Sequence, residues 1–421
     1  MTSSANEKAK EAEAYVWVWL PNALEPVVAG RLAPGEGGLQ FNYAKSYLGR
    51  EDAIALYEPE LPLRAGALQL LQSLTMPGCI RDASPDAWGR RVIINQMLGR
   101  RGRVVDTNEL DEITYLLKSG SNRIGALDFQ SSPAAYEPRY VEAATLEELL
   151  ASAERVESGI ALSPELDQAL NYGTAIGGAR PKAQISGKKK QYIAKFSSTN
   201  DLHNIIKAEF IAMRLAALLG LHTAEVKLTR AAGKDVLLVT RFDRLHTSQG
   251  WNRKAMVSAL TLFELDEMMA RYASYETLAE IIRHRFVDHK EALRELFSRM
   301  VFNILVGNTD DHARNHAAFW DGQTLRLTPA FDICPQARGG NEASQAMLIT
   351  GNDRRSLLTT CLQAARHFLL SEQKARAIID CQVDDVRTHW PTVCEEAKLS
   401  QVDQGVLWER AILNPFVFEG F

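Results

Sequence analysis

Apolar residues recur at helical spacing between residues 293 and 305, immediately ahead of a short polar stretch. This period predicts a buried helix. Gly307 and Asn308 follow it, and both residue types favour the end of a helix. The polar residues 307–315 are therefore expected on a loop that directly follows this helix.

A β-hairpin is predicted directly after this loop. Two apolar runs occur at residues 317–320 and 324–328, and the turn residues Asp321 and Gly322 separate them. Asp332 follows the second run. The helix and the hairpin should therefore brace the polar loop from both sides.

The N-terminal part of the chain has the pattern of a β-meander. Short apolar runs cover residues 15–20, 27–32 and 39–43, and a Pro- and Gly-rich turn at 34–38 separates the last two. Residues 124–129 predict one more strand of the same kind.

The middle of the chain alternates strands and helices, and the pattern is mainly helical from Trp251 onward. Residues 191–196 and 235–240 predict strands, and residues 205–219 predict a helix that ends at Gly220. Further helices are expected at residues 144–157, 277–286, 291–306, 356–380, 383–399 and 401–413.

The chain has 421 residues, of which 46% are hydrophobic and 24% charged, and its formal net charge is −4. This length suits two or three domains of ~150 residues, and the charge does not imply nucleic acid as a direct partner. No apolar run approaches the ~20 residues that a membrane span needs. The polar start of the chain lacks the apolar segment of a signal peptide, so we expect a cytoplasmic protein without a membrane partner.

The cysteines predict no disulfide framework and no zinc site. There are five, an odd number, and none forms a CxxC pair. Cys334 lies two residues from Asp332, and we interpret it as a small buried filler.

Three polar residues around the predicted hairpin suit phosphoryl transfer. A kinase needs an Asp to accept the proton of the hydroxyl, an Asn on the same loop to bind metal, and a second Asp after a hairpin. Asp310, Asn315 and Asp332 occupy these positions, and the first two are five residues apart, as in a kinase catalytic loop. Taken alone, this spacing is also common in loops whose Asp and Asn residues only cap turns.

A glycine-rich stretch at residues 171–182 is a candidate phosphate-binding loop. Gly177 and Gly178 allow positive φ and a close backbone approach, and Arg180 and Lys182 add positive charge. An ordinary glycine-rich turn is the alternative, because neither a Walker A nor a GxGxxG motif is present.

Lys195 lies within the apolar run of the predicted strand 191–196, so it needs an anionic partner. In a kinase that partner is an ATP phosphate together with a helix Glu. Glu209, on the predicted helix 205–219, is the nearest candidate, although a solvent-exposed role for Glu209 remains open.

Residues 82–91 predict a capped helix, with Ser84 at the cap and Pro85 at the first helical position. Asp86 and Arg90 would form a binding site in a functional interpretation. We favour the structural one, in which this helix attaches the N-terminal region to the core.

Several of these segments resemble the HipA family of toxin serine/threonine kinases. The resemblance is carried by residues 307–316, which read Gly-Asn-Thr-Asp-Asp-His-Ala-Arg-Asn-His, and by residues 327–335 and 177–182. It extends over nearly the whole chain from about residue 15. It implies a kinase that uses ATP and Mg²⁺, with Asp310 as the base and Asn315 and Asp332 as metal ligands.

The resemblance also implies the residues around the nucleotide. Lys195 matches the nucleotide lysine of the family, and Thr240 and Phe242 lie where the backbone meets the adenine. His312 is expected to orient the catalytic loop by hydrogen bonds. The phosphate loop would comprise Gly177, Gly178, Ala179, Arg180 and Lys182.

The fold that follows is α+β, with a small β-rich N-terminal subdomain ahead of a two-lobed, kinase-like core whose C-lobe is mainly helical. Residues 1–14 would form a frayed or disordered lead. The N-terminal subdomain with its connecting helices would cover residues 15–160, the N-lobe 161–245 and the C-lobe 246–421.

The resemblance further implies partners. A small, dimeric helix-turn-helix antitoxin would restrain the kinase and would make the DNA contact, and a protein would be the substrate. In family members with known targets, the target is an aminoacyl-tRNA synthetase. A catalytically weak co-repressor and a small-molecule kinase are the alternatives.

A last expectation concerns self-regulation. In many relatives a serine just ahead of the glycine-rich motif is autophosphorylated, which silences the enzyme. The matching position here is Ala175, so we predict modification of its neighbour Thr174. A phosphate there would add about −1.5 to −2 charges beside the site for the ATP phosphates.

Overall fold

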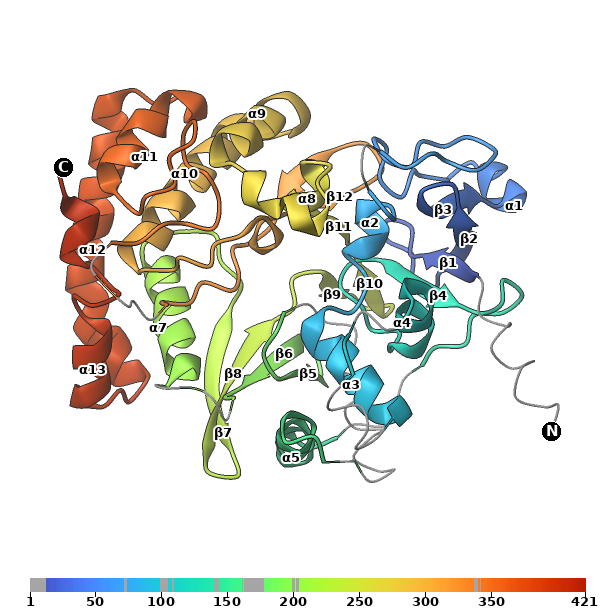
Figure 1. The fold of residues 1–421 in the computed structure, drawn as a ribbon, viewed down its shortest axis with the longest axis horizontal. Helices are drawn as coiled ribbons and strands as arrows, with labels where there is room; N and C mark the ends of the chain where they lie inside the picture. The colour runs from blue at the N-terminus through green and yellow to red at the C-terminus, as the bar shows by residue number, and fades with distance from the viewer. Residues whose placement is uncertain are drawn as a thin grey trace.

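The computed structural model describes residues 13–71, 74–98, 105–107, 110–139, 144–160, 162, 178–198, 201, 204–336, 340 and 342–421. Helices and strands are mixed along the chain, so the architecture is α+β, as the sequence predicts. Figure 1 shows an N-terminal sheet at the right, a second sheet at the bottom and a helical region at the left.

The N-terminal sheet has the strand order β3-β2-β1-β4, and its described pairs are antiparallel. At the β2–β3 turn, Gly37 and Gly38 have φ angles of 81° and 151°, which residues with a Cβ rarely adopt. The predicted meander is confirmed, and β4 pairs with the free edge of β1. The strands are β1 (Ala14–Val18), β2 (Val27–Gly35), β3 (Gly38–Tyr43) and β4 (Leu127–Gln130).

Short helices accompany this sheet. Helix α3 begins at Ala87, two residues later than predicted, and Ser84 donates its hydroxyl to Glu112 at 3.4 Å. The backbone carbonyl of Asp86 accepts the bond from Arg90 N at 2.8 Å that opens the helix. The helices are α1 (Lys45–Leu48), α2 (Gly78–Arg81), α3 (Ala87–Leu98) and α4 (Glu112–Lys118).

The second sheet, which we term the N-lobe sheet, has the order β5-β6-β8-β7. Successive residues of a strand face opposite sides. Phe196 and Val236 accordingly pack with α5 and Trp88, whereas Leu237 and Val239 join the cluster that contains the apolar residues of α7. The elements are α5 (Leu146–Glu157), β5 (Lys182–Ser186), β6 (Gln191–Phe196), α7 (Ile205–Leu218), β7 (Val226–Ala231) and β8 (Lys234–Thr240).

The C-lobe is built around α10, which matches the predicted buried helix. Its residues Leu293, Leu296, Met300 and Ile304 are buried completely. The predicted hairpin is also present and pairs with β11. The elements are β9 (Arg244–His246), β10 (Trp251–Arg253), β11 (Ala255–Ser258), α8 (Ala259–Leu262), η2 (Glu267–Tyr272), α9 (Tyr275–Arg285), α10 (His289–Leu305), η3 (Ala313–Asn315), β12 (Ala317–Trp320), β13 (Leu325–Leu327), α11 (Leu358–Ala364), η4 (Ala365–Phe368), α12 (Glu372–Glu396), α13 (Gln401–Leu407) and η5 (Pro415–Phe418).

One expected helix boundary in this lobe is wrong, and two short strands were not predicted. Strands β10 and β11 lie within residues 251–258. Strand β10 pairs with β9, and β11 pairs with the hairpin. Helix α12 runs unbroken past residues 380–383, since Asp380 and Cys381 are exposed on its solvent side. The chain turns instead at Leu369, which has a φ of 58°, and Ser371 then caps α12.

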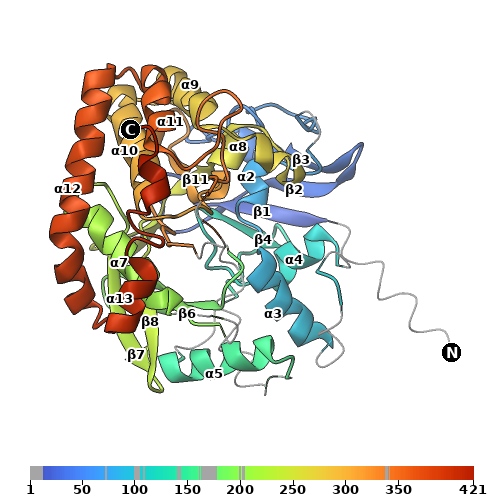
Figure 2. The ribbon, with the colours of Figure 1, turned by 60° about the vertical axis from the view of Figure 1, so that its left-hand side comes forward.

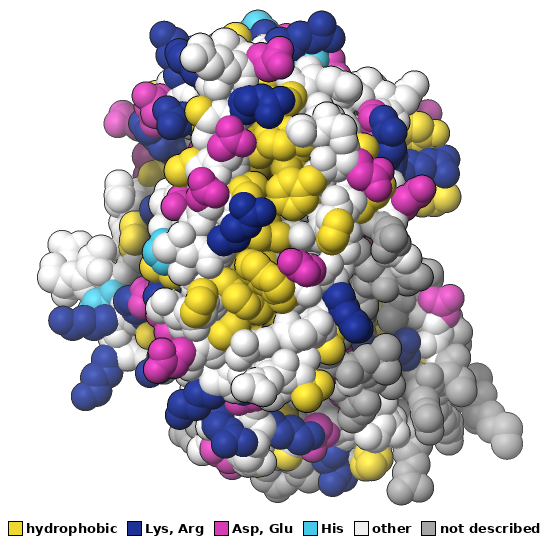
Figure 3. Space-filling view, turned by 90° about the vertical axis from the view of Figure 1, so that its left-hand side faces the viewer, with side chains coloured by type: hydrophobic (Ala, Val, Ile, Leu, Met, Phe, Trp, Pro, Cys, Tyr) yellow, Lys and Arg dark blue, Asp and Glu magenta, His cyan; other side chains and the backbone are white. Residues whose placement is uncertain are grey.

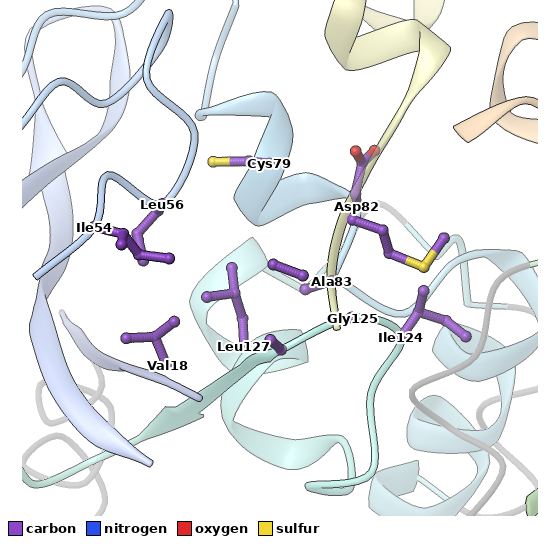
Figure 4. A pocket seen from close by; sticks show the side chains of 12 residues that line it. Val18, Ile54, Leu56, Cys79, Asp82, Ala83, Ile124, Gly125 and Leu127 are labelled. Carbon is purple, nitrogen blue, oxygen red and sulfur yellow. The ribbon is translucent and has the colours of Figure 1, made fainter. Parts of the chain in front are cut away.

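The N-terminal region meets the C-lobe around a small cavity (Figure 4). The cavity measures about 20 Å³, which is room for about one water molecule. Asp82 lies at its side and accepts hydrogen bonds from the backbone N–H and the hydroxyl of Ser258, both at 2.7 Å. Helix α2 is thereby joined to β11. The lining residues are Val18, Ile54, Leu56, Cys79, Asp82, Ala83, Ile124, Gly125, Ala126, Leu127, Ala255 and Met256.

Apolar side chains form a band on the face viewed in Figure 3, which is the face of α12 and α13 in Figure 1. Exposed or half-exposed apolar residues of these elements and their neighbours include Leu369, Ile378, Val402, Trp408 and Phe421. Within the described residues, none of the helices combines the length and the apolar character needed to cross a membrane.

Candidate active site

The loop after α10 is fixed at the end of that helix. Gly307 has a φ of 70°, and a Cβ there would lie 2.6 Å from the carbonyl oxygen of Ala411, so a side chain does not fit. Asn308 is buried and bonds back to Asn303 through both its backbone N–H (2.8 Å) and its side-chain amide (3.0 Å). The start of the loop is therefore held rigidly.

Asp310, His312 and Asn315 lie on one tight turn of this loop. His312 N donates to the Asp310 carbonyl at 2.9 Å, and Asn315 N donates to the His312 carbonyl at 2.8 Å. The Asn315 side-chain amide also donates to the Asp310 carbonyl, at 3.2 Å. This last bond uses the Nδ2 atom of Asn315 and leaves its Oδ1 as the acceptor.

The role expected for the His312 side chain stays a prediction. His312 shapes the loop through its backbone, whereas its Nδ1 atom is buried and has no hydrogen-bond partner among the described residues. The side chain that braces the loop is His316, whose Nε2 lies 2.9 Å from Asp311 Oδ1.

A buried polar cluster that was not predicted lies behind the loop and consists of Asp311, Tyr275 and His316. The Tyr275 hydroxyl donates to Asp311 Oδ2, and burial together with the Asp311 charge raises the pKa of Tyr275 well above its usual value. The adjacent pair Asp310 and Asp311 is the feature of the sequence that could have indicated this cluster. Two neighbouring carboxylates on a tight loop point into different environments, so one of them needs partners behind the loop.

Lys195 joins three parts of the fold. Its Nζ lies 2.5 Å from Glu209 Oε1 on α7 and 2.5 Å from Asp332 Oδ1, beyond the hairpin. Burial lowers the pKa of Lys195, but the charges of Asp332 and Glu209 outweigh this effect and raise it. The expected pairing of Lys195 with Glu209 is therefore confirmed.

Asp332 has a strained backbone, with a φ of 59°, and such strain often marks functional sites. Burial raises the pKa of its carboxyl, but the charges of Lys195 and Lys182 outweigh burial and lower it far below its usual value. Asp332 therefore stays ionised. A carboxylate and the free amide oxygen of Asn315 are oxygen ligands of the kind that Mg²⁺ prefers.

The environment of Asp310 shifts the pKa of its carboxyl upward, opposite to the shift at Asp332. Burial raises the pKa of its carboxyl, and the neighbouring charges of Asp332 and Asp311 raise it further, while His312 and Arg314 act in the other direction. A carboxyl group with a raised pKa is better suited to accept a proton than an ordinary one.

The glycine-rich loop is only partly described, and Gly177 and Thr174 lie outside the described residues. Gly178 has a φ of 105°, and a Cβ at this position would lie 1.9 Å from Lys182 Nζ. Glycine is therefore required for the Lys182 ammonium to lie against the loop backbone. Ala179 is exposed, and Arg180 forms an ion pair with Asp201 at 2.5 Å.

The segment after β8 connects the two lobes. Thr240 pairs with Tyr192 of β6, and the Phe242 ring packs against Phe331, with ring centroids 5.6 Å apart. Asp243 is buried and accepts bonds from Arg241 at 2.7 Å and Arg244 at 2.8 Å. The expectation that Asp243 and Arg244 brace this connection is confirmed.

Comparison with known proteins matches two separate stretches of the chain to family models. The model of the HipA N-terminal domain matches residues 18–130, and that of the HipA-like C-terminal domain matches residues 174–390. A Haemophilus influenzae protein named "Putative kinase" is 26% identical over 41% of this chain and 55% of its own length. The serine/threonine-protein kinase toxin HipA of Shewanella oneidensis is 24% identical over 38% of this chain and 42% of its own length. The chain thus spans about half the length of these two relatives.

A solved structure shares the fold. It contains HipA of the Shewanella oneidensis MR-1 toxin–antitoxin system with HipB and operator DNA, and it matches 94% of this chain and 96% of its own chain. The TM-score is 0.65 and the sequence identity is 16%. Because the C-terminal model alone covers more than half of the residues and the N-terminal model covers most of the remainder, this chain belongs to the HipA family.

Proposed function

We propose that this chain is an ATP- and Mg²⁺-dependent serine/threonine protein kinase that acts as the toxin of a toxin–antitoxin pair. The observation that carries the proposal is the position of Lys195, which bridges Glu209 on α7 and Asp332 beside the loop of Asp310 and Asn315. A strand Lys paired with a helix Glu and with an Asp after the catalytic loop is the arrangement of a kinase.

The roles of the residues follow from their environments. Asp310 accepts the proton as the substrate hydroxyl oxygen attacks the γ-phosphorus and ADP leaves. Asn315 and Asp332 hold Mg²⁺, which neutralises phosphate charge when it is bound. Gly178, with the neighbouring loop residues Gly177, Ala179, Arg180 and Lys182, binds the phosphates.

The adenine is proposed to lie against the connection between the lobes. Phe242 is half-buried and packs with Phe331, the residue directly before Asp332. An aromatic wall at this point would set the adenine at one end of the site and the metal ligands at the other. Thr240 would supply backbone contacts.

The toxin role rests on the relatives. One is named as a toxin kinase, and the solved structure holds HipA together with HipB and operator DNA. For this chain we propose a cytoplasmic complex with a dimeric helix-turn-helix antitoxin, which makes the DNA contact. The substrate would be a protein, and an aminoacyl-tRNA synthetase is the first candidate to test.

The test is transfer of γ-³²P from ATP by the purified chain, with and without Mg²⁺. Dephosphorylated lysate proteins and a metabolite extract are offered separately, and Asp332→Ala and Asn315→Ala serve as metal-site variants. Label on a protein Ser or Thr, with Mg²⁺-dependent ATP binding lost in both variants, supports the proposal. Label only on a metabolite favours a small-molecule kinase, and absence of transfer favours a co-repressor.

Self-regulation through Thr174 is part of this proposal. Mass spectrometry after incubation with ATP and Mg²⁺ should find phosphate on Thr174, and the modified fraction should be less active because the added charge repels the ATP phosphates. Phosphate on another residue, or an unmodified loop in active protein, contradicts it.

A further inference from the structure

The N-terminal region contacts the phosphate-binding loop directly, through the first turn of α3. The Trp88 indole Nε1 donates to the Lys182 carbonyl at 3.0 Å, and Trp88 N donates to the Gly178 carbonyl at 3.3 Å. Figures 1 and 2 both show α3 beside the N-lobe sheet, on the side of β5 and β6. Because Trp88 is only 3% exposed and packs in the core of this sheet, the contact fixes the residues just ahead of α3.

Asp86 is one of these residues, and it lies among charged groups of the proposed active site. Burial raises the pKa of its carboxyl to about 7, Lys182 and Arg314 oppose this effect, and Asp332 and Glu267 reinforce it. Lys182 lies on β5, and Arg314 lies on the loop of Asp310. Asp332 follows the hairpin, and Glu267 lies on η2. Asp86 therefore faces the place where the two lobes meet.

The Asp86 carboxylate differs from its acidic neighbours in having an empty acceptor position. Glu267 is paired with Arg314 at 2.7 Å, and Asp332 is paired with Lys195 at 2.5 Å. Asp86 Oδ1, in contrast, is buried and has no hydrogen-bond partner among the described residues. A buried acceptor without a donor destabilises a protein, so its presence beside a reaction site indicates a ligand that supplies the donor.

The charge and the hydrogen-bonding groups of the possible partners limit the chemical class of that ligand. Above about pH 7 the Asp86 carboxyl is ionised, and it then repels the ATP phosphates, which are anionic and carry no donor. The missing partner must be an N–H, an O–H or a cation. Asp332 and Asn315 already offer ligands for the metal, and Asp310 is assigned to the hydroxyl itself. Asp86 is therefore available as a further acceptor for another group of the molecule that brings the hydroxyl.

We propose that Asp86 binds the phosphate acceptor: its carboxylate accepts a hydrogen bond from an N–H, O–H or ammonium group of the protein segment that carries the hydroxyl. This inference rests on the proposed kinase function and deepens it. It makes the N-terminal region part of the active site, because Trp88 holds the phosphate loop and Asp86 positions the substrate.

The probe is a mixture of short peptides, each with one central Ser or Thr, phosphorylated by the full chain with Mg²⁺ and ATP. Asp86→Asn keeps the shape of the side chain and removes its charge, Asp86→Glu restores the charge, and Glu112→Gln removes another carboxylate beside α3. The readouts are the KM for peptide, the KM for ATP, the Mg²⁺ concentration for half-maximal rate and the thermal midpoint.

Asp86→Asn should raise the peptide KM roughly 10-fold, since charge-assisted hydrogen bonds are about twice as strong as neutral ones. The KM for ATP and the Mg²⁺ requirement should stay within about twofold of the wild type. Measured above pH 7, where the Asp86 carboxyl is ionised, the thermal midpoint should rise by roughly 1–3 °C, because a buried charge without a hydrogen-bond donor is removed. A merely structural Asp86 would lower it. Asp86→Glu should recover part of the peptide affinity, and Glu112→Gln should leave the peptide KM unchanged.

Two results overturn the inference while the kinase function stands: an unchanged peptide KM in Asp86→Asn, or a shift in the Mg²⁺ requirement, which would make Asp86 a metal ligand. Failure of the wild type to label any peptide, with Mg²⁺-ATP bound, overturns the proposed function and this inference with it.

Discussion

At the scale of single residues, two carboxylates that lie close together experience opposite environments. Burial and like charges raise the pKa of Asp310, whereas Lys195 and Lys182 overcome burial and lower that of Asp332. Carboxyl groups whose pKa values are driven apart usually divide the roles in a reaction. Asp310 is therefore suited to take a proton, and Asp332 to remain a permanent anion.

We expect Asp310→Asn to lower phosphoryl transfer by about 10²- to 10⁴-fold, the usual contribution of a general base. The Kd for Mg²⁺-ATP, measured by calorimetry, should change less than about threefold, because Asp310 is not a metal ligand in the proposal. Wild-type transfer should also fall as the pH is lowered through the raised pKa of Asp310, since the protonated carboxyl cannot accept the proton. Normal turnover in the variant would exclude Asp310 as the base.

Lys195→Met should remain folded but lose the thermal stabilisation that ATP gives the wild type. Methionine keeps the length of the side chain, and the buried Glu209 can become neutral, because burial already raises its pKa. Lys190→Met is the matched control, since its ammonium is half-exposed and pairs with Glu225 near the same strand. Equal ATP-induced shifts in the two variants would show that Lys195 does not contact the nucleotide.

At the scale of elements, the geometry of the loop that carries Asp310 and Asn315 depends on the elements packed behind it. Helix α10 holds its start through Asn308, and α9 supplies Tyr275 to the buried carboxylate of Asp311. A buried carboxylate is tolerated only when its acceptor positions are filled. The loop geometry is therefore a property of α9, α10 and the hairpin together.

Tyr275→Phe removes one donor from buried Asp311 and should cost about 1–3 kcal/mol of unfolding free energy. The KM for ATP should change little while kcat falls, because the loop and not the nucleotide site is loosened. Tyr272→Phe, at an exposed tyrosine on η2, should stay within about 0.5 kcal/mol of the wild type in the same urea titration. An unaffected Tyr275→Phe would mean that the cluster does not brace the loop.

Glu60, which accepts hydrogen bonds from the first turn of helix α2, provides a test of how stability depends on pH. Glu60 is buried and accepts bonds from the backbone N–H groups of Gly78 and Cys79, both at 2.8 Å, yet burial raises its pKa from 4.5 to about 7. The folded state thus binds this proton more tightly than the unfolded state. The associated stability is present below about pH 4.5 and is lost as the pH rises through 7, by about 3 kcal/mol.

Glu60→Gln cannot titrate, so its unfolding free energy should depend less on pH between 5 and 8 than that of the wild type. Glu58→Gln, at an exposed position nearby, should keep the wild-type slope. Parallel pH profiles for the wild type and Glu60→Gln, measured by urea unfolding, would contradict the raised pKa.

At the scale of the whole molecule, a buried ionic network ties the N-terminal region to the connection between the lobes. Asp243 pairs with Arg241 and Arg244, and it accepts a bond from Gly125 N at 2.8 Å. Arg244 also donates to the Gly125 carbonyl at 2.8 Å. The N-terminal region is thus bonded to the proposed nucleotide site at two places, here and at Trp88.

Asp243→Asn should destabilise the protein by about 3–5 kcal/mol, because two buried guanidinium groups lose their counter-charge. Asp52→Asn, which breaks the exposed pair with Arg50, should leave the unfolding free energy nearly unchanged, because exposed ion pairs are screened by solvent. Chemical denaturation of both variants is the measurement. A small effect at Asp243 would mean that the N-terminal region is held mainly by its apolar contacts.

Segments with several apolar residues in a regular pattern were predictable, and segments with few apolar residues were not. Residues 191–196, 205–219 and 291–306 each contain a regular apolar period, and the structure has β6, α7 and α10 there. Strands β5, β7, β10 and β11 were missed, because each contains three apolar residues or fewer and is stabilised by pairing with neighbouring strands.

The sequence by itself determined the chemistry that the chain carries: the local spacing of Asp310 and Asn315, the lysine inside an apolar strand and the glycines of the loop. These depend on neighbours a few residues away, so the one-dimensional pattern contains them. Only the tertiary structure decided which distant groups meet. The bridge from Lys195 to Asp332, the Tyr275–Asp311 bond and the position of Asp86 beside Lys182 join residues 36 to 137 positions apart in the chain. Such contacts arise from the packing of whole elements, which local patterns do not encode.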